Sequence, residues 1–265
     1  MDASRVIDHI TSWLQEYCER AGQSGFVIGI SGGVDSAVTS TLCARTGLPT
    51  LCVEIPIHQH FSQVQRGQEH IEWLKANYPN VKLEVVKLTS VFDAMVAELP
   101  RKDNEDAMQL SLANTRARLR MTVLYYFAGI HRSLVVGTGN KVEDFGVGFF
   151  TKYGDGGVDL SPIADLTKTH VYALAKELGV IDSIIKAPPT DGLWGDDRTD
   201  ADQIGATYPE LEWAMDLRER GMDIRQLSLS DRQREVLAIF DRRHAANRHK
   251  MVPIPICEVP AEMKG

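Results

Sequence analysis

A short stretch of small and acidic residues, Ser31-Gly-Gly-Val-Asp-Ser36, has the composition of a ligand-binding turn. Gly32 and Gly33 allow the backbone to turn sharply and to approach a ligand without an intervening Cβ. The serine hydroxyls can donate hydrogen bonds, and the Asp35 carboxylate is a suitable ligand for a divalent cation. This combination predicts a cradle for phosphate groups with a metal ion beside it.

The flanking residues predict the elements that hold this turn. Residues 26–30 are apolar and rich in β-branched types, and the run is too short for a helix, which indicates a buried parallel strand. A helix is predicted over 37–44, and the free N–H groups at a helix start attract anions. Neither G-x-x-x-x-G-K-[ST] nor G-x-G-x-x-G lies near this strand, so the turn is of a third kind. An ordinary strand-to-helix turn with serine capping is the alternative.

A second polar turn follows a second predicted strand. Residues 133–138 predict the strand, and Gly137-Thr-Gly-Asn-Lys-Val-Glu143 leaves its carboxyl end. Because open parallel sheets bind ligands at this edge, both turns are expected to face one site. Glu143 can then join Asp35 as a second carboxylate for Mg²⁺, which usually takes one or two protein carboxylates beside phosphates. The alternative is that Glu143 is a solvated helix residue.

A third motif combines aromatic rings, glycines and charges: Phe149-Phe-Thr-Lys-Tyr-Gly-Asp-Gly-Gly-Val-Asp159. Aromatic faces suit base stacking, and aspartates accept hydrogen bonds from ribose hydroxyls. The whole segment 142–157 is predicted to be a long loop, and loops of this length are usually functional. A plain mobile loop is the alternative.

These motifs resemble those of a known family. Ser-Gly-Gly-x-Asp-Ser resembles the pyrophosphate-binding loop of the N-type ATP pyrophosphatases. Within that superfamily the chain resembles the ammonia-dependent NAD synthetases. The resemblance covers almost the whole chain. The matching segments are the three above, Asn114-Thr-Arg-Ala-Arg118-Leu-Arg120-Met121 and Arg248-His249-Lys250-Met-Val-Pro253. The aromatic-glycine motif is the most specific of them.

The resemblance implies roles for individual residues. Asp35 and Lys168 would be catalytic, and Asp35 and Glu143 would hold Mg²⁺. Deamido-NAD would contact Arg118, Lys152, Asp159, His249 and Lys250. ATP, as co-substrate, would contact Gly29, Ile30, Ser31, Gly32, Gly33, Val34, Asp35, Ser36, Thr138, Lys168 and Thr190.

Two positions depart from the family pattern. Glu54 stands where the family often has an arginine that contacts the nucleotide, so Gln59 and His58 are candidate substitutes. Thr115 replaces a more usual aliphatic residue, which is expected to matter little.

The implied reaction is the amidation of deamido-NAD to NAD. A nicotinate carboxylate oxygen attacks the α-phosphorus of ATP, pyrophosphate leaves, and ammonia then displaces AMP from the acyl adenylate. Two alternatives stay open: another ATP pyrophosphatase that amidates or thiolates its substrate, and a nucleotide-binding regulator without catalysis. A tRNA-thiolating enzyme would be expected to have basic patches and paired cysteines, which the sequence lacks.

The predicted fold class is α/β, with one open parallel sheet flanked by helices, Rossmann-like and similar to the adenine nucleotide alpha hydrolases. Residues 1–265 are expected to form a single domain with a C-terminal helical and irregular tail, and no glutaminase domain. Further strands are predicted near 51–56 and 81–88. Helices are predicted over the first twenty residues and over 61–78, 107–130, 167–178, 201–220 and 231–247.

Composition limits the classes of partner. The net charge of −7 and the lack of a basic block recommend neither a nucleic acid nor a membrane partner. The start of the chain has no secretory pattern, so a cytoplasmic location is expected. Four scattered cysteines without a C-x-x-C pair argue against zinc and disulfides. The resemblance implies a homodimer, in which the helix over 107–130 could bury a partner face.

Overall fold

A computed structural model of the chain describes residues 1–190, 199–222 and 227–265. Its centre is an open, fully parallel sheet with strand order β3-β2-β1-β4. The central strand pairs on both sides, with Phe26 opposite Thr50 and Leu134. The strands are β1 (Gly25–Gly29), β2 (Thr50–Glu54), β3 (Val81–Val85) and β4 (Ser133–Val135). The predicted α/β class with a parallel sheet is confirmed.

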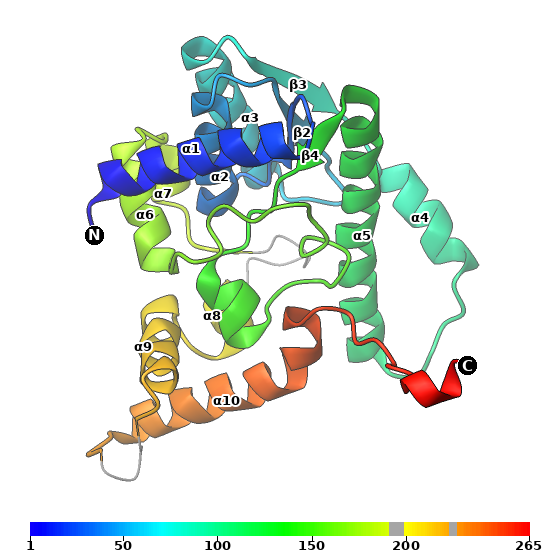
Figure 1. Cartoon of the computed structure of the whole chain (residues 1–265), viewed down its shortest axis with the longest axis vertical. Helices are drawn as coiled ribbons and strands as arrows, with labels where there is room; N and C mark the ends of the chain where they lie inside the picture. Colours follow the sequence, from blue (N-terminus) through cyan, green and yellow to red (C-terminus); the bar gives the residue numbers. More distant parts are fainter. Residues whose placement is uncertain (191–198, 223–226) are drawn as a thin grey trace.

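Helices cover both faces of this sheet (Figure 1). Those before the third strand are α1 (Ala3–Arg20), α2 (Val34–Arg45) and α3 (Phe61–Asn77). Then come α4 (Thr89–Glu98), α5 (Glu105–His131), the π-helix η1 (Val142–Val147), α6 (Lys168–Glu177) and α7 (Asp182–Ile185). The last are α8 (Asp200–Ile204), α9 (Tyr208–Glu219), α10 (Asp231–Met251) and the short η3 (Ala261–Met263). None of the helices in the described ranges is long and apolar enough to span a membrane.

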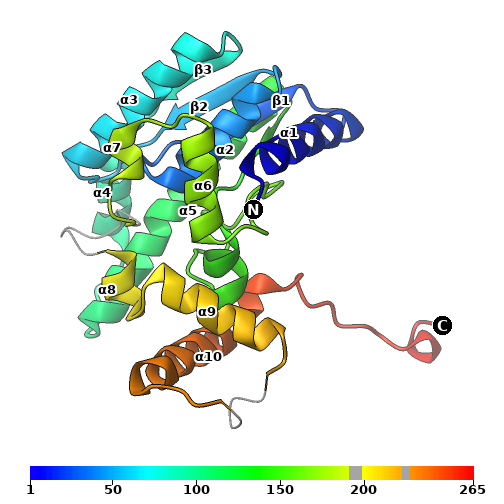
Figure 2. The same cartoon turned by 90° about the vertical axis from the view of Figure 1, so that its left-hand side faces the viewer.

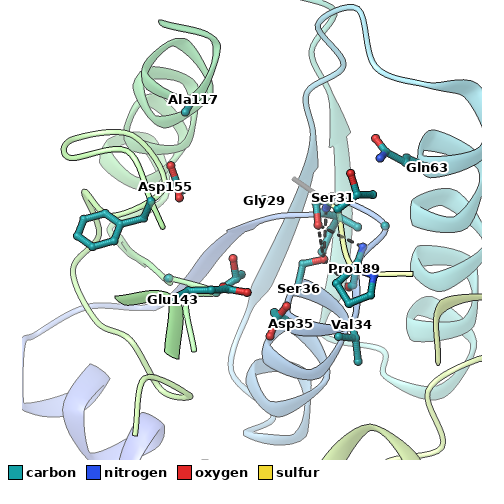
Figure 3. A pocket seen from close by; sticks show the side chains of 18 of the residues that line it. Gly29, Ser31, Val34, Asp35, Ser36, Gln63, Ala117, Glu143, Asp155 and Pro189 are labelled. Carbon is teal, nitrogen blue, oxygen red and sulfur yellow. Dashed lines mark hydrogen bonds between the residues drawn. The ribbon is translucent and has the colours of Figure 1, made fainter. Parts of the chain in front are cut away.

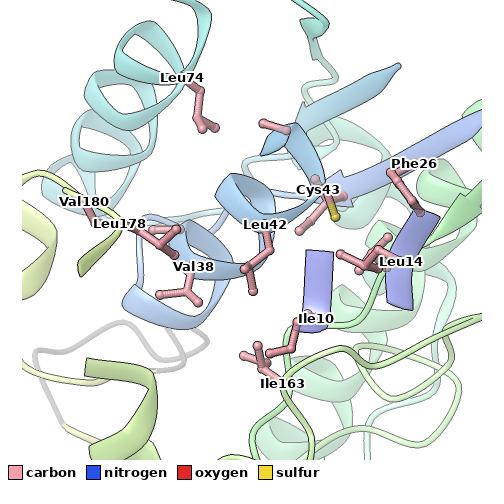
Figure 4. Packing of buried hydrophobic residues seen from close by; sticks show 14 of the residues in the cluster. Ile10, Leu14, Phe26, Val38, Leu42, Cys43, Leu74, Ile163, Leu178 and Val180 are labelled. Carbon is pink, nitrogen blue, oxygen red and sulfur yellow. The ribbon is translucent and has the colours of Figure 1, made fainter. Parts of the chain in front are cut away.

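The central strand is buried on both faces, as a short apolar run predicts. Phe26 and Ile28 pack into the cluster formed with α1, α2 and α6, whereas Val27 points to the opposite face and packs with α5. Figure 4 shows α2 lying within the first cluster, where Val38 and Leu42 are fully buried. Because α2 is enclosed along most of its length, its first turn is held firmly at the end of β1.

A separate apolar cluster lies beneath the sheet and holds η1. Val142 and Val147 are fully buried against α9 and α10, where their neighbours include Leu211 and Phe240. Figure 2 shows these helices below the sheet, with the C-terminal tail extending away from them. Apart from η3, residues 252–265 have no regular structure.

Two local expectations were wrong, and two α-helices were not expected. The segment 142–157 does not begin as a loop but as η1, because its apolar residues pack against α9 and α10. The helix predicted over 201–220 is two helices, since Gly205 at φ +91° ends α8 and Thr207 begins α9 with a capping box. Finally, α4 and α7 have no counterpart among the predicted elements.

Candidate functional site

The turn after β1 is held in shape by its own serines (Figure 3). The Ser36 hydroxyl donates to the Gly33 carbonyl oxygen at 3.0 Å and lies 3.0 Å from the Ser31 hydroxyl. The Ser31 hydroxyl in turn accepts the Gly33 N–H at 3.2 Å. The loop is therefore held in shape by hydrogen bonds among its own residues.

The helix that follows begins without a side-chain cap. Its N-cap residue is Gly33, which has no side chain to accept the first N–H groups, and Asp35 lies in the first turn. An uncapped helix start carries unsatisfied N–H donors and the positive end of the helix dipole. The end of β1 thus presents an anion-binding site to the adjoining pocket.

Close packing fixes the residue type at position 32. Gly32 has φ +81°, and a Cβ built there would lie 2.2 Å from the Gln63 carbonyl oxygen of α3. From the same helix, Arg66 Nε donates to the Gly32 carbonyl oxygen at 3.3 Å. The turn therefore needs glycine both for its backbone conformation and for its contact with α3.

Three charged side chains from three elements meet beside this turn. Lys168 Nζ, at the start of α6, lies 2.5 Å from Asp35 Oδ2 and 3.0 Å from Glu143 Oε1. The Lys168 side chain is only 5% exposed, and those of Asp35 and Glu143 are 17% and 15% exposed. The structure brings Asp35 and Glu143 together, with Lys168 as the cation between them.

Electrostatics stabilises the protonated form of this lysine. Burial alone would lower the pKa of Lys168, but the charges of Asp35 and Glu143 outweigh it and raise the pKa. Burial raises the pKa of Asp35, and the ammonium of Lys168 opposes that change. The lysine is therefore a permanent positive charge at neutral pH.

Two residues that the sequence did not single out complete this cluster. The Tyr208 hydroxyl lies within hydrogen-bond distance of Glu143 Oε1 and Asp200 Oδ2. Lys168 Nζ lies 4.5 Å from the centroid of the Tyr208 ring. Burial, followed by the charges of Glu143 and Asp200, raises the pKa of Tyr208 well above its usual value. Tyr208 and Asp200 lie in a segment without a chemical motif, so no sequence signal pointed to them.

All eleven residues expected to contact ATP line one pocket. Glu143 lines it too, together with further polar residues that the sequence did not assign. Those are Gln63, Arg66, Arg120, Asp144, Asp155 and Asp200. The predicted ATP set is Gly29, Ile30, Ser31, Gly32, Gly33, Val34, Asp35, Ser36, Thr138, Lys168 and Thr190.

The residues expected to contact deamido-NAD lie outside that pocket lining. Arg118 Nε donates to the Lys152 carbonyl oxygen at 3.2 Å, and Lys152 Nζ donates to the His249 carbonyl oxygen at 3.1 Å. Lys250 Nζ donates to the carbonyl oxygens of Gly148 at 2.5 Å and Phe150 at 2.7 Å. Four of the five residues therefore join α5, the 148–153 loop and the end of α10.

Asp159 has a different setting from these four. Its Oδ2 accepts the Val135 N–H at 2.7 Å, and its Oδ1 accepts the Tyr125 hydroxyl at 3.1 Å. Burial, followed by the charge of Asp159, raises the pKa of Tyr125 to about 12. Asp159 thus secures the end of β4 to α5 in this structure.

Glu54, which stands where the family often has an arginine, lies away from the pocket. Glu54 is buried and accepts a hydrogen bond from Gln68 of α3 at 3.2 Å, and it does not line the pocket. Gln59 does line the pocket and donates to the Ser31 carbonyl oxygen at 3.3 Å, whereas His58 instead pairs with Asp93. Of the two candidate substitutes, Gln59 is the one beside the glycine turn.

No group of three or more His, Cys, Asp or Glu side chains with metal-binding geometry occurs in the part of the chain that the structure describes. The two carboxylates at Asp35 and Glu143, however, converge on one cation, the ammonium of Lys168. A Mg²⁺ ion that takes its other ligands from phosphates and water needs no more than two protein carboxylates. The donor set fits such an ion.

An open parallel sheet, a glycine turn at its carboxyl edge and an uncapped helix beside buried carboxylates define an α/β nucleotide-binding protein. The family model described as NAD synthase matches residues 6–253. The chain belongs to this NAD synthase family.

Named relatives agree with the family. The NH(3)-dependent NAD(+) synthetase of Carboxydothermus hydrogenoformans is 42% identical over 77% of this chain and 82% of its own. That of Alkaliphilus metalliredigens is 36% identical over 97% of this chain and 99% of its own. The solved structure of NMN synthetase from Francisella tularensis superposes with a TM-score of 0.82 at 30% identity, over 98% and 99% of the two chains.

Proposed function

We propose that this protein is a ligase that converts deamido-NAD to NAD with ATP and ammonia, releasing AMP and pyrophosphate. The observation that carries the proposal is the convergence of the glycine turn, the uncapped start of α2 and the Asp35–Lys168–Glu143 cluster on one pocket. Family membership and the names of the relatives support the same reaction.

ATP is proposed to bind with its phosphates on the glycine turn. The serine-fixed loop and the free N–H groups at the start of α2 would hold phosphate oxygens, and Thr138 and Thr190 line the same pocket. Such preorganised donors neutralise the charge that develops on the leaving pyrophosphate, because they need no reorganisation during the reaction.

Mg²⁺ is the proposed cofactor, held by Asp35 and Glu143. When bound it would neutralise phosphate charge as a Lewis acid. Lys168, the other proposed catalytic residue, carries a permanent charge within reach of both carboxylates, so it can turn to a phosphate oxygen when the carboxylates are otherwise engaged. Catalysis then depends on positioning and charge, and no protein nucleophile is required.

Deamido-NAD is proposed to contact Arg118, Lys152, Asp159, His249 and Lys250. Three of these cations lie along a continuous path from α5 to the end of α10, which suits a dinucleotide with negatively charged phosphates. The nicotinate carboxylate would have to reach from this path to the α-phosphorus of ATP in the pocket. Asp159 would act through a ribose hydroxyl or by supporting α5 through Tyr125.

A second candidate substrate is the smaller mononucleotide of nicotinic acid. It is favoured by the likeness to a structure that is named as an NMN synthetase. Amidation of the mononucleotide uses the same carboxylate and the same ATP chemistry, so the pocket at the glycine turn serves both reactions equally.

The test is to incubate the protein with ATP, Mg²⁺ and ammonium, and with either deamido-NAD or nicotinate mononucleotide. Chromatography is expected to show AMP and NAD in equal amounts with the dinucleotide. Faster AMP formation with the mononucleotide would reassign the substrate. A folded sample that binds ATP but yields no AMP with either acid would leave a regulatory nucleotide-binding role.

The nitrogen donor, the domain organisation and the assembly are also proposals. Free ammonia is the proposed donor, because the two curated relatives are named for NH(3) and match most or all of their length. A single domain over 1–265 and a cytoplasmic location are proposed as well. A homodimer would cover the exposed apolar side chains of α5, which include Leu110, Tyr126 and Ile130. Light scattering on the purified protein measures the assembly directly.

A further inference from the structure

Asn140 is a fully buried polar residue. None of the roles proposed above is assigned to it. Its Oδ1 accepts the backbone N–H groups of Val142 at 3.1 Å and Glu143 at 3.2 Å. Its Nδ2 donates to Asp35 Oδ1 at 3.2 Å. Two N–H donors on one side and a carboxylate on the other fix the orientation of the amide, because the reverse would place oxygen against oxygen.

This amide joins two elements that the chain sequence keeps far apart. Asp35 stands in the first turn of α2 and Glu143 in the first turn of η1, and Asn140 bonds to the side chain of one and the backbone of the other. On Asp35 the amide engages Oδ1 while Lys168 engages Oδ2. The carboxylate is therefore fixed from both sides, and so is the backbone from which Glu143 projects.

We propose that Asn140 is a positioning residue that sets the spacing of Asp35 and Glu143 so that one cation can bridge them. The inference rests on the proposed function, in which these carboxylates hold Mg²⁺. Hydrogen-bond partners that orient ligating carboxylates typically change metal affinity about 10- to 100-fold. The bond from Nδ2 to Asp35 is the contact responsible for this role.

The rival explanation is that Asn140 only starts η1. That role uses Oδ1 alone, so substitutions can separate the two functions. Asn140→Asp keeps the size and the acceptor for both N–H groups but replaces the donor with an oxygen facing Asp35. Asn140→Ser keeps a hydroxyl near the start of η1 but is too short to reach Asp35.

The test measures Mn²⁺ affinity by electron paramagnetic resonance, with the non-cleavable analogue α,β-methylene ATP present. Both Asn140 variants are expected to bind Mn²⁺ about 10- to 100-fold more weakly than the wild type. In turnover they should need correspondingly more Mg²⁺, with kcat partly recovered at high Mg²⁺. If Asn140 only capped η1, the substitutions would lower Tm and leave the Mg²⁺ requirement unchanged.

Asn80→Asp is the matched control. Asn80 Nδ2 also bonds within the fold, to the carbonyl oxygens of Ala44 at 2.9 Å and Leu48 at 2.7 Å, but these bonds are to backbone and not to a carboxylate. This variant should lower Tm and leave Mn²⁺ affinity as in the wild type.

Equal Mn²⁺ affinity in the wild type and both Asn140 variants would overturn the proposal, as would tighter binding by Asn140→Asp or an equal loss in Asn80→Asp. NAD formation by the wild type together with such a result would leave the proposed function standing. Weaker Mn²⁺ binding by both variants in a protein that forms no NAD would support the positioning role and remove the proposed reaction.

Discussion

Lys168 Nζ lies 2.5 Å from Asp35 Oδ2, so a lysine from the start of α6 neutralises a carboxylate from the start of α2. The same ammonium lies 3.0 Å from Glu143 Oε1, and it therefore occupies the place between the two carboxylates proposed to hold Mg²⁺. Burying two carboxylates without a cation would be costly, because charges in a low-dielectric environment lose their hydration. The ammonium of Lys168 supplies the positive charge that offsets this cost.

Replacing Lys168 should separate metal binding from catalysis. In Lys168→Met, Mn²⁺ affinity measured without nucleotide is expected to rise, because the competing ammonium is gone. NAD formation should nevertheless fall roughly 100- to 1,000-fold, since a positioned charge that acts on the phosphates is lost. Lys176→Met, on the exposed side of α6, is the control and should change neither quantity. Unchanged or weaker Mn²⁺ binding in Lys168→Met would contradict the idea that the Lys168 ammonium competes with the metal ion for the two carboxylates.

Two glycines with positive φ allow the effect of the contact between Gly32 and α3 to be separated from the effect of backbone strain. Gly32 has φ +81° and meets the Gln63 carbonyl oxygen, whereas Gly47 has φ +76° and nothing within 4 Å. Gly47→Ala is expected to cost only backbone strain, about 1 kcal/mol of the free energy of unfolding, with the KM for ATP unchanged. Gly32→Ala should cost more in urea denaturation and should raise the KM for ATP. Equal effects of the two substitutions on stability and on the KM for ATP would show that α3 shifts to accommodate the added methyl group at position 32.

His70 should make the fold sensitive to acid. Burial lowers the pKa of His70 to about 4, whereas in the unfolded chain it should be near 6.5. As the pH falls below 6.5 the unfolded chain gains the proton first, so stability is complete above pH 6.5 and is lost toward pH 4. By pH 4.5 the loss should be about 2 to 3 kcal/mol.

The check on His70 is urea denaturation at pH 7.5 and pH 4.5. His70→Gln keeps a polar partner for the Ser40 hydroxyl, which lies 3.0 Å from His70 Nε2, but it does not titrate. The variant should lose about 2 to 3 kcal/mol less than the wild type between the two pH values. The same loss in both proteins would assign the acid sensitivity to other groups.

Lys250 is expected to act on the acid substrate and not on ATP. Its ammonium holds the carbonyl oxygens of Gly148 and Phe150 and lies 4.8 Å from the Phe150 ring centroid. Lys250→Met should raise the KM for deamido-NAD about tenfold or more, because two charge-assisted hydrogen bonds that order the loop are lost. The KM for ATP should change less than the KM for deamido-NAD, because Lys250 itself does not line the pocket at the glycine turn. Steady-state kinetics with each substrate varied in turn measures both values.

Lys264→Met, in the exposed tail, is the control for Lys250 and should behave as the wild type. Limited proteolysis adds a second measurement, since the loop near Tyr153 should be cut faster in Lys250→Met. An unchanged KM for deamido-NAD would remove Lys250 from the proposed substrate site.

The sequence alone determined the strand, the turn and the helix at residues 26–44, because these depend on local chemistry. β-branched residues favour the strand, Gly32 and Gly33 permit the turn, and a glycine turn of this kind leads into the start of a helix. The sequence also predicted that Glu143 would face Asp35, since polar turns after parallel strands meet at one edge of the sheet.

Only the tertiary structure decided how that site is supported. The bonds from Asn140 and Lys168 to Asp35 span 105 and 133 residues, and the contact of Tyr208 with Glu143 joins elements that share no motif. The π-helix that carries Glu143 forms because Val142 and Val147 pack against α9 and α10, which no local pattern around them predicts. Residue types fix what a turn can bind, but packing between distant elements fixes which side chains surround it.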